Sequence, residues 1–204
     1  MFEIRIHGRG GQGVVTAAEL LSVAAFDEGR HAQAFPSFGS ERTGAPVASF
    51  CRIDDRRIRS REPIGTPDAL IIVDPTLMHQ VSVFGGVRGD AFVLINSTRS
   101  ASELGLGTLV SRLRAGRLQT VPATDLARRH VGRPLPNAAL LGGFAALTGI
   151  VSIDSVTSAI RQRFHGNVGE GNAAAAQAAY QLVADQTAPR PVGALTAGGS
   201  EGQP

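Results

Sequence analysis

Short apolar segments alternate with helix-like stretches along the first half of the chain. Segments typical of strands lie at residues 3–7, 31–35, 69–73, 91–95 and 118–121. The first is followed by residues 12–28, whose apolar positions recur at helical spacing until Gly29. The continuous apolar runs at 69–73 and 91–95 are typical of strands covered on both faces. Together these patterns predict an α/β fold with three layers and a largely parallel sheet.

One segment departs from this alternation. Residues 46–58 are rich in strand-forming residues, with Asp54 and Asp55 placed where a turn would be. This pattern predicts a β-hairpin insertion around residues 47–60, and it makes the sheet mixed.

The second half of the chain has a helical pattern. Asn137 is a candidate cap for a helix over 138–148, and Ser152 for one over 153–164. An alanine-rich stretch at 172–185 predicts the last helix. From about residue 188 the chain is Pro, Gly, Ala, Ser and Thr with almost no apolar bulk. We therefore expect one domain over residues 1–187 and a disordered tail over 188–204.

Composition limits the chemistry of the chain. It has 204 residues, 43% of them hydrophobic, and no apolar run long enough to cross a bilayer. Its start lacks the basic and apolar pattern of a secretory signal, so we expect a soluble cytoplasmic protein without a membrane partner. A single cysteine, Cys51, permits neither an internal disulfide nor an iron–sulfur cluster with four ligands from this chain.

The charged residues exclude two further classes of function. All twenty basic residues are arginine, so a lysine base or a Schiff base is excluded. The formal net charge of +3 is modest and predicts no nucleic-acid-binding face. The arginines between Arg52 and Arg61 are interleaved with acids, and a solvated, self-paired hairpin is the favoured interpretation.

The glycine pattern at the end of the first strand is the strongest local signal. Gly8, Gly10 and Gly13 form a G-x-G-x-x-G pattern between a strand and a helix, which usually indicates a dinucleotide site. A nicotinamide site also needs an acid at the end of the second strand, and residues 33–36 contain none. An arginine could instead meet a 2′-phosphate. The turn could also receive another phosphate, seat a neighbouring chain, or serve packing alone.

Two longer blocks carry a family resemblance. "HGRGGQGVVTAAELL" at 7–21 and "QAFPSFGSERTGAPVASFCRIDDRRI" at 33–58 resemble the gamma subunit of the 2-oxoacid:ferredoxin oxidoreductases, as in pyruvate synthase. The resemblance continues through "PDALIIVDPTL" at 67–77, "PNAALLGGFAALTGIVSIDSVTSAIRQRF" at 136–164 and "GNVGEGNAAAAQAAY" at 166–180. It covers nearly the whole chain except the tail.

The resemblance implies a subunit of a complex that converts a 2-oxoacid and coenzyme A into acyl-CoA and CO2. Thiamine diphosphate is then held by the alpha and beta subunits, and iron–sulfur clusters by beta and a ferredoxin-like subunit. The gamma subunit carries neither and helps to form the coenzyme A site. The particular 2-oxoacid and the choice between ferredoxin and NAD as acceptor stay open, as do a free-standing NAD(P)-binding oxidoreductase and a pure scaffold.

We expect no catalytic residue and no metal ligand in this chain. Arg42, on a polar loop, could bind a phosphate through two parallel hydrogen bonds or contact a partner subunit instead. The candidate coenzyme A-binding residues are Gly8, Arg9, Gly10, Gly11, Gln12, Gly13, Ser37, Arg42, Thr43 and Asn137.

Overall fold

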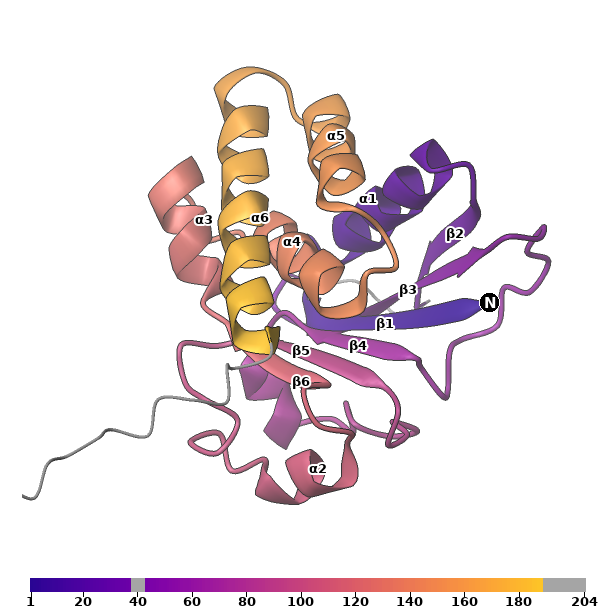
Figure 1. The fold of residues 1–204 in the computed structure, drawn as a ribbon, viewed down its shortest axis with the longest axis vertical. Coiled ribbons are helices and arrows are strands. Elements are labelled where there is room, and N and C mark those ends of the chain that lie inside the picture. Colours follow the sequence, from indigo (N-terminus) through magenta and orange to yellow (C-terminus); the bar gives the residue numbers. More distant parts are fainter. Residues whose placement is uncertain (38–42, 189–204) are drawn as a thin grey trace, which may run out of the picture.

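The computed structural model describes residues 1–37 and 43–188, which build one six-stranded sheet with helices on both faces (Figure 1). The strand order is β2-β3-β1-β4-β5-β6, and only β3 is antiparallel to its two neighbours. The predicted α/β fold with a largely parallel sheet is confirmed. The strands are β1 (Phe2–Arg9), β2 (His31–Pro36), β3 (Pro46–Asp54), β4 (Ala69–Ile72), β5 (Phe92–Asn96) and β6 (Leu118–Val121).

The predicted hairpin within residues 47–60 is wrong in its position. β3 is a single continuous strand, and its antiparallel partner is β2, with Phe35 opposite Phe50. The two arms of the hairpin are therefore β2 and β3, and its connection precedes β3 in the chain. Asp54 and Asp55 mark the end of β3, where the chain leaves the sheet.

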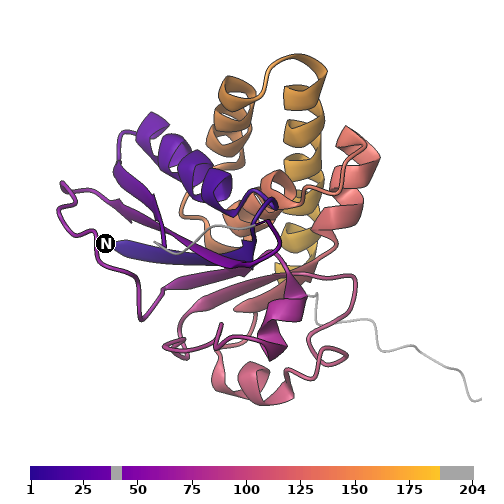
Figure 2. The same ribbon diagram turned by 180° about the vertical axis from the view of Figure 1, so that it is seen from behind.

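Five helices cover one face of the sheet, so the predicted helical C-terminal half is confirmed (Figures 1 and 2). Ser152 caps its helix as expected, since its hydroxyl accepts a hydrogen bond from Ser155 N at 3.1 Å. None of the helices in the described ranges is long and apolar enough to cross a membrane. The five are α1 (Val14–Asp27), α3 (Ala123–Val131), α4 (Asn137–Thr148), α5 (Ile153–Arg163) and α6 (Gly166–Thr187).

The last helix begins six residues earlier than the alanine-rich pattern predicts. The pattern misses the first turns because they contain Gly169 and Gly171, which have low helix propensity. Both positions require glycine, because neighbouring backbone lies too close for a side chain. A Cβ on Gly169 would stand 2.0 Å from the Phe164 carbonyl oxygen, and one on Gly171 would stand 2.5 Å from that of His130. These glycines let α6 pack on the ends of α5 and α3 despite their low helix propensity. The expected tail lies outside the described residues beyond Ala188.

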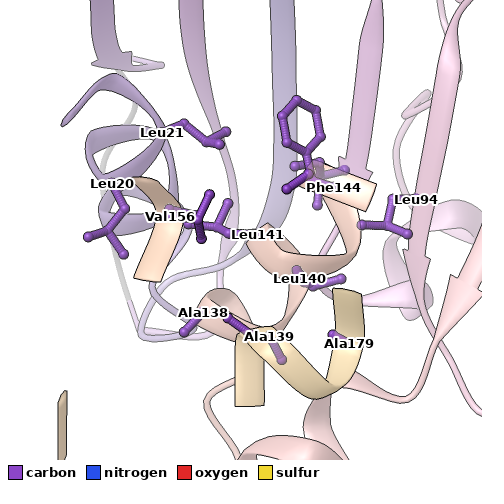
Figure 3. Close-up of a cluster of buried hydrophobic side chains, with 14 of the residues drawn as sticks. Leu20, Leu21, Leu94, Ala138, Ala139, Leu140, Leu141, Phe144, Val156 and Ala179 are labelled. Carbon is purple, nitrogen blue, oxygen red and sulfur yellow. The ribbon is translucent and has the colours of Figure 1, made fainter. Parts of the chain in front are cut away.

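The main core lies between this helical layer and the sheet, and α4 is at its centre (Figure 3). Ten of the twelve residues of α4 are buried, including Leu140 and Phe144. At Gly142 the helix approaches α6 closely: a Cβ there would stand 1.9 Å from the Ala176 carbonyl oxygen. Cys51 is fully buried in the same core, and desolvation raises the pKa of its thiol to about 12, as suits a packing residue.

The opposite face has a thinner cover made by the 3-10 helix η1 (Pro75–His79), the short α2 (Gly107–Arg112) and loops (Figure 2). Under β4 and β5 this layer packs a second apolar core, centred on Leu77. Under β1 this layer is polar instead, because the side chain of Arg5 points into it. The Arg5 guanidinium donates to four backbone carbonyls, those of Ile64, Gly65, Val83 and Gly85.

Candidate functional site

The glycine turn joins β1 to α1 at the carboxyl edge of the parallel strands, where ligands bind in open α/β sheets. It is tied to the segment before β3: Gly10 N donates to Ala45 O (2.9 Å) and Gly44 N donates to Gly10 O (3.0 Å). Gly11 and Gly13 have φ values of 93° and 74°, in the left-handed region that favours glycine. The turn is therefore a fixed backbone structure.

Gly13 is the N-cap residue of α1, and no side chain caps this helix. A Cβ on Gly13 would stand 2.5 Å from Nδ2 of Asn137, so only glycine lets the two residues pack together. Asn137 is itself the first residue of α4. The amino ends of two helices, α1 and α4, therefore meet at this contact.

The predicted capping role of Asn137 is wrong. The residue before α4 is Pro136, and the Asn137 side chain makes no capping hydrogen bond. Asn137 is only 6% exposed, yet its amide has no hydrogen-bond partner among the described residues. The fully buried side-chain atoms without a partner in the described parts of the chain are Arg5 Nε and His7 Nε2, so the Asn137 amide still reaches solvent. It is thus available to a ligand at the meeting point of the helices.

This arrangement suits an anion. Unsatisfied N–H groups and the helix dipole make the amino end of a helix attractive to negative charge. Beside the turn lies a hollow of about 300 Å³, lined by the glycines, Arg9, Val47 and the first turn of α1. Its size and its backbone donors suit a phosphate group.

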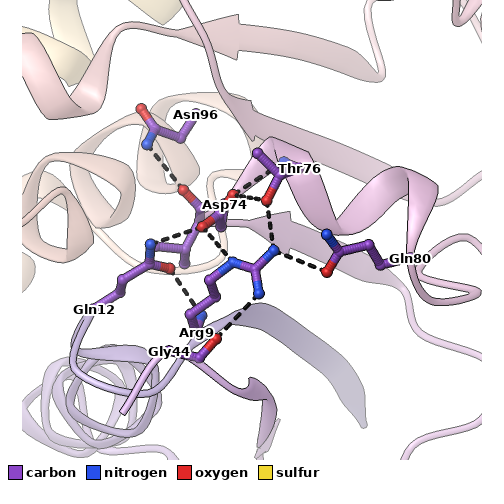
Figure 4. Close-up of polar contacts among 8 residues, drawn as sticks. Arg9, Gln12, Gly44, Asp74, Thr76, Gln80 and Asn96 are labelled. Carbon is purple, nitrogen blue, oxygen red and sulfur yellow. Dashed lines mark hydrogen bonds and ion pairs between the residues drawn. The ribbon is translucent and has the colours of Figure 1, made fainter.

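Arg9 is a predicted coenzyme A-binding residue, but its guanidinium is engaged by other residues of the chain (Figure 4). Its Nε donates to Asp74 (3.0 Å) and one terminal nitrogen donates to Gly44 O (3.1 Å). The other terminal nitrogen donates to Thr76 (2.8 Å) and Gln80 (2.9 Å). Four of its five N–H groups are thus engaged within the chain, and the guanidinium fills the crevice between the ends of β1 and β4.

Asp74 and Gln12 complete this network. Partial burial alone would raise the pKa of Asp74, but hydrogen bonds from Thr76 and Gln12 and the charge of Arg9 hold it below its usual value. The Gln12 amide donates to Asp74 (2.9 Å) and accepts from Arg9 N (2.8 Å). The side chain of Gln12, more than its backbone, therefore fixes the turn.

His7 is neutral in the folded chain at ordinary pH. Desolvation and the nearby charge of Arg5 lower its pKa from 6.5 to about 4. Its Nε2 is buried without a partner among the described residues. This environment favours a structural role for His7 over that of a proton carrier at neutral pH.

Most of the predicted binding residues gather at this turn. Thr43 pairs with Gly10 in an isolated bridge, and a Cβ on Gly8 would lie 2.5 Å from Val14 Cγ2, which keeps the turn close to α1. Ser37 lies farther away, because its N donates to Ala48 O on the strand next to β1. Arg42 lies outside the described residues. The residues brought together are Gly8, Arg9, Gly10, Gly11, Gln12, Gly13, Thr43 and Asn137.

Known proteins share this architecture and sequence. The model of the pyruvate ferredoxin/flavodoxin oxidoreductase family matches residues 3–182. The chain belongs to this family. Pyruvate synthase subunit PorC of Methanothermobacter marburgensis is 46% identical over 181 residues, which cover 89% of this chain and 97% of that protein. The common gamma subunit of the pyruvate/ketoisovalerate oxidoreductases of Thermococcus kodakarensis is 47% identical, with coverage of 88% and 96%.

Solved structures agree with the family assignment. Pyruvate oxidoreductase subunit PORC of Thermotoga maritima superposes with a TM-score of 0.75 at 33% identity, covering 88% of this chain and 95% of that one. A 2-oxoglutarate:ferredoxin oxidoreductase of Magnetococcus marinus has the same fold, with a TM-score of 0.68 at 15% identity; the match covers 91% of this chain and 31% of that one. The predicted resemblance to gamma subunits of multisubunit oxoacid oxidoreductases is confirmed.

Sequence reasoning missed the partners of Arg9. Asp74, Thr76 and Gln80 are not among the predicted site residues. They lie 65 to 71 residues from Arg9 in the chain. The available signal was that both segments directly follow apolar strands, because the carboxyl ends of parallel strands lie at one edge of a sheet; the structure shows that β1 and β4 are neighbours.

Proposed function

We propose that this chain is the gamma subunit of a thiamine diphosphate-dependent 2-oxoacid:acceptor oxidoreductase that makes acyl-CoA and CO2 from a 2-oxoacid and coenzyme A. Within that complex, its own task is to hold a phosphate-bearing end of coenzyme A at the glycine turn. Thiamine diphosphate belongs to the alpha and beta subunits, and iron–sulfur clusters belong to beta and a ferredoxin-like subunit. The isolated chain is catalytically inactive.

The observation that carries this proposal is the meeting of two uncapped helix ends at Gly13 and Asn137, where the Asn137 amide makes no hydrogen bond to another described residue. Coenzyme A offers the matching chemistry, a diphosphate and a 3′-phosphate. A protein that shares this fold, the 2-oxoglutarate:ferredoxin oxidoreductase of Magnetococcus marinus, has a solved structure with 2-oxoglutarate, coenzyme A and succinyl-CoA bound.

Holding the nucleotide end contributes to turnover by positioning. The thiol of coenzyme A must reach an acyl intermediate on another subunit, and a tethered thiol attacks in an effectively intramolecular step. Backbone donors of the turn and the amide of Asn137 bind, while Asp74 holds the Arg9 side chain beside the turn. Chemistry at the thiamine ring stays with the partner subunits.

Asn137→Asp in the assembled complex tests the site. The substitution preserves the shape of the side chain and places a negative charge beside the proposed phosphate. We expect the Michaelis constant for coenzyme A to rise more than tenfold and that for the 2-oxoacid to stay unchanged. The matched control is Asn167→Asp, the same change in the exposed first turn of α6. Equal Michaelis constants for coenzyme A in the two variants would reject the site.

Calorimetric titration of the wild-type chain with coenzyme A, NADH and NADPH separates the alternatives. Tight binding of a reduced nicotinamide by the isolated chain would favour the free-standing oxidoreductase. Normal assembly with a coenzyme A dependence that no site variant alters would favour a pure scaffold.

A further inference from the structure

The loop that follows β3 carries four arginines in six positions. Residues 55–62 form this arginine loop, and the side chains of Arg56, Arg57, Arg59 and Arg61 are exposed. The loop lies at the amino-terminal end of β1, because Ile53 pairs with Phe2 (Figure 1). The glycine turn lies at the other end of the eight-residue strand, about 25 Å away. The loop is therefore separate from the candidate anion site.

The expected self-pairing of these arginines is wrong. The carboxylates near the loop are engaged by other cations: Asp54 by the amino terminus (3.2 Å), Asp55 by Arg30 (3.0 Å) and Glu3 by Arg52 (2.7 Å). None of the four arginines forms an ion pair with any residue in the described parts of the chain. With Asp55 and Glu62, the four arginines give the loop a formal net charge of +2.

A buried arginine fixes the loop from beneath. One terminal nitrogen of Arg52 donates to Ser60 O (3.3 Å) and the other donates to Glu62 O (2.7 Å), while its Nε donates to Glu3. Its guanidinium also lies over the ring of Phe35, 5.2 Å from the centroid. The backbone of the loop is thus ordered before any partner arrives, which lowers the entropy cost of binding.

We propose that the arginine loop is a docking surface for an acidic patch on a partner subunit of the complex. An exposed row of guanidinium groups on an ordered backbone, without an ion pair among the described residues, steers a negatively charged protein surface into register. A small anion needs a concave site that encloses it, and these side chains project into solvent. The loop has no aromatic residue on which a nucleic-acid base could stack.

The test measures association of the purified chain with the remaining subunits of its complex. The triple variant Arg56→Glu, Arg57→Glu and Arg59→Glu is used, because these side chains make no hydrogen bond within the described residues. Arg61 is left unchanged, since its Nε donates to Gln33 (3.1 Å) in the amide orientation that gives both Gln33 atoms a partner. Thermal unfolding of the variant should match that of the wild type.

At about 50 mM salt we expect the triple glutamate variant to associate about 10- to 100-fold more slowly than the wild type. The wild-type rate should fall steeply toward about 300 mM salt, and the variant rate should not. Replacing the same three arginines by lysine should keep the rate within about threefold, because steering depends on charge. A matched control with the same charge change, Arg112→Glu, Arg129→Glu and Arg133→Glu, should associate almost normally.

Two results would overturn the proposal: a triple glutamate variant that associates like the wild type, or a control variant that is slowed equally. Tight binding of duplex DNA or of anionic lipid vesicles by the wild type, lost in the triple glutamate variant, would also overturn it. The loop would then be a phosphate-binding surface.

Discussion

Arg5 and Arg9 lie on the same face of β1, four residues apart, and their surroundings differ completely. Arg5 is buried, and its guanidinium is held by four backbone carbonyls of two loops. Arg9 is partly exposed and is held mainly by side chains, those of Asp74, Thr76 and Gln80. Backbone carbonyls move only if their loops move, whereas side chains reorient freely. The guanidinium of Arg5 is thus fixed by the fold, whereas the guanidinium of Arg9 is adjustable because its partners can reorient.

The largest expected difference between the two arginines is in their effect on the free energy of unfolding. Arg5→Met leaves four carbonyls, two buried and two partly buried, without their donor, so we expect a loss of about 3–5 kcal/mol in the free energy of unfolding. Arg9→Met removes a partly exposed ion pair and should cost about 1 kcal/mol. Urea unfolding of both variants gives the two values. Equal losses would show that the two arginines play the same structural part.

The pH dependence of stability tests the residue between them. The pKa of His7 is about 4 in the folded chain and about 6.5 when unfolded, so below pH 6.5 the unfolded chain binds the extra proton first. The wild type should therefore lose roughly 2 kcal/mol between pH 7 and pH 5. His7→Gln should remove most of this slope, and the exposed His165→Gln should keep it. An identical slope in all three proteins would contradict the buried, neutral His7.

A third test asks whether Arg42 binds coenzyme A. Arg42→Ala in the assembled complex should raise the Michaelis constant for coenzyme A about 10- to 100-fold, since one charge-assisted contact contributes roughly 1.5–3 kcal/mol. The Michaelis constant for the 2-oxoacid should hardly change. Failure of the complex to assemble would place Arg42 at the subunit interface, and an unchanged coenzyme A dependence would show that it is not a ligand.

The smallest expected effect concerns Asp74. Asp74→Asn weakens the hold on Arg9 and leaves the neighbouring hydrogen bonds of similar geometry possible. If Arg9 is adjustable, the affinity for coenzyme A should rise by about two- to fivefold, a fraction of what one charge-assisted contact contributes. Calorimetry on the Asp74→Asn and Asp74→Glu variants measures it, with the glutamate preserving the charge. A lower affinity in Asp74→Asn alone would mean that Arg9 serves only to position the turn.

The sequence predicted the strands and the helices wherever periodicity was local. The runs at β4 and β5 and the cap at Ser152 are examples, because each depends on residues close together in the chain. The polar alternation of Glu3, Arg5 and His7 in β1 was also visible. It could have indicated a buried charge, but the loops that satisfy Arg5 lie 59 to 80 residues away.

The candidate site was predicted in outline only. The glycine spacing located the turn, since φ above zero and close backbone approach need glycine. The meeting of α1 with α4 and the state of the Asn137 amide depend on tertiary packing. A capping motif predicts the start of a helix within a residue or two, which is too coarse to decide whether Asn137 caps α4 or begins it.

The close packing of α4 against α6 has a consequence for biosynthesis. Helix α4 is apolar almost all round, and it contacts α6 closely at Gly142. The ribosome makes about 5–20 residues per second, so the 51 residues from Asn137 to Thr187 take roughly 3–10 s. During that interval the nascent α4 lacks the cover it has in the finished protein. The moment of greatest need for a chaperone therefore falls late in translation, just before the last helix emerges.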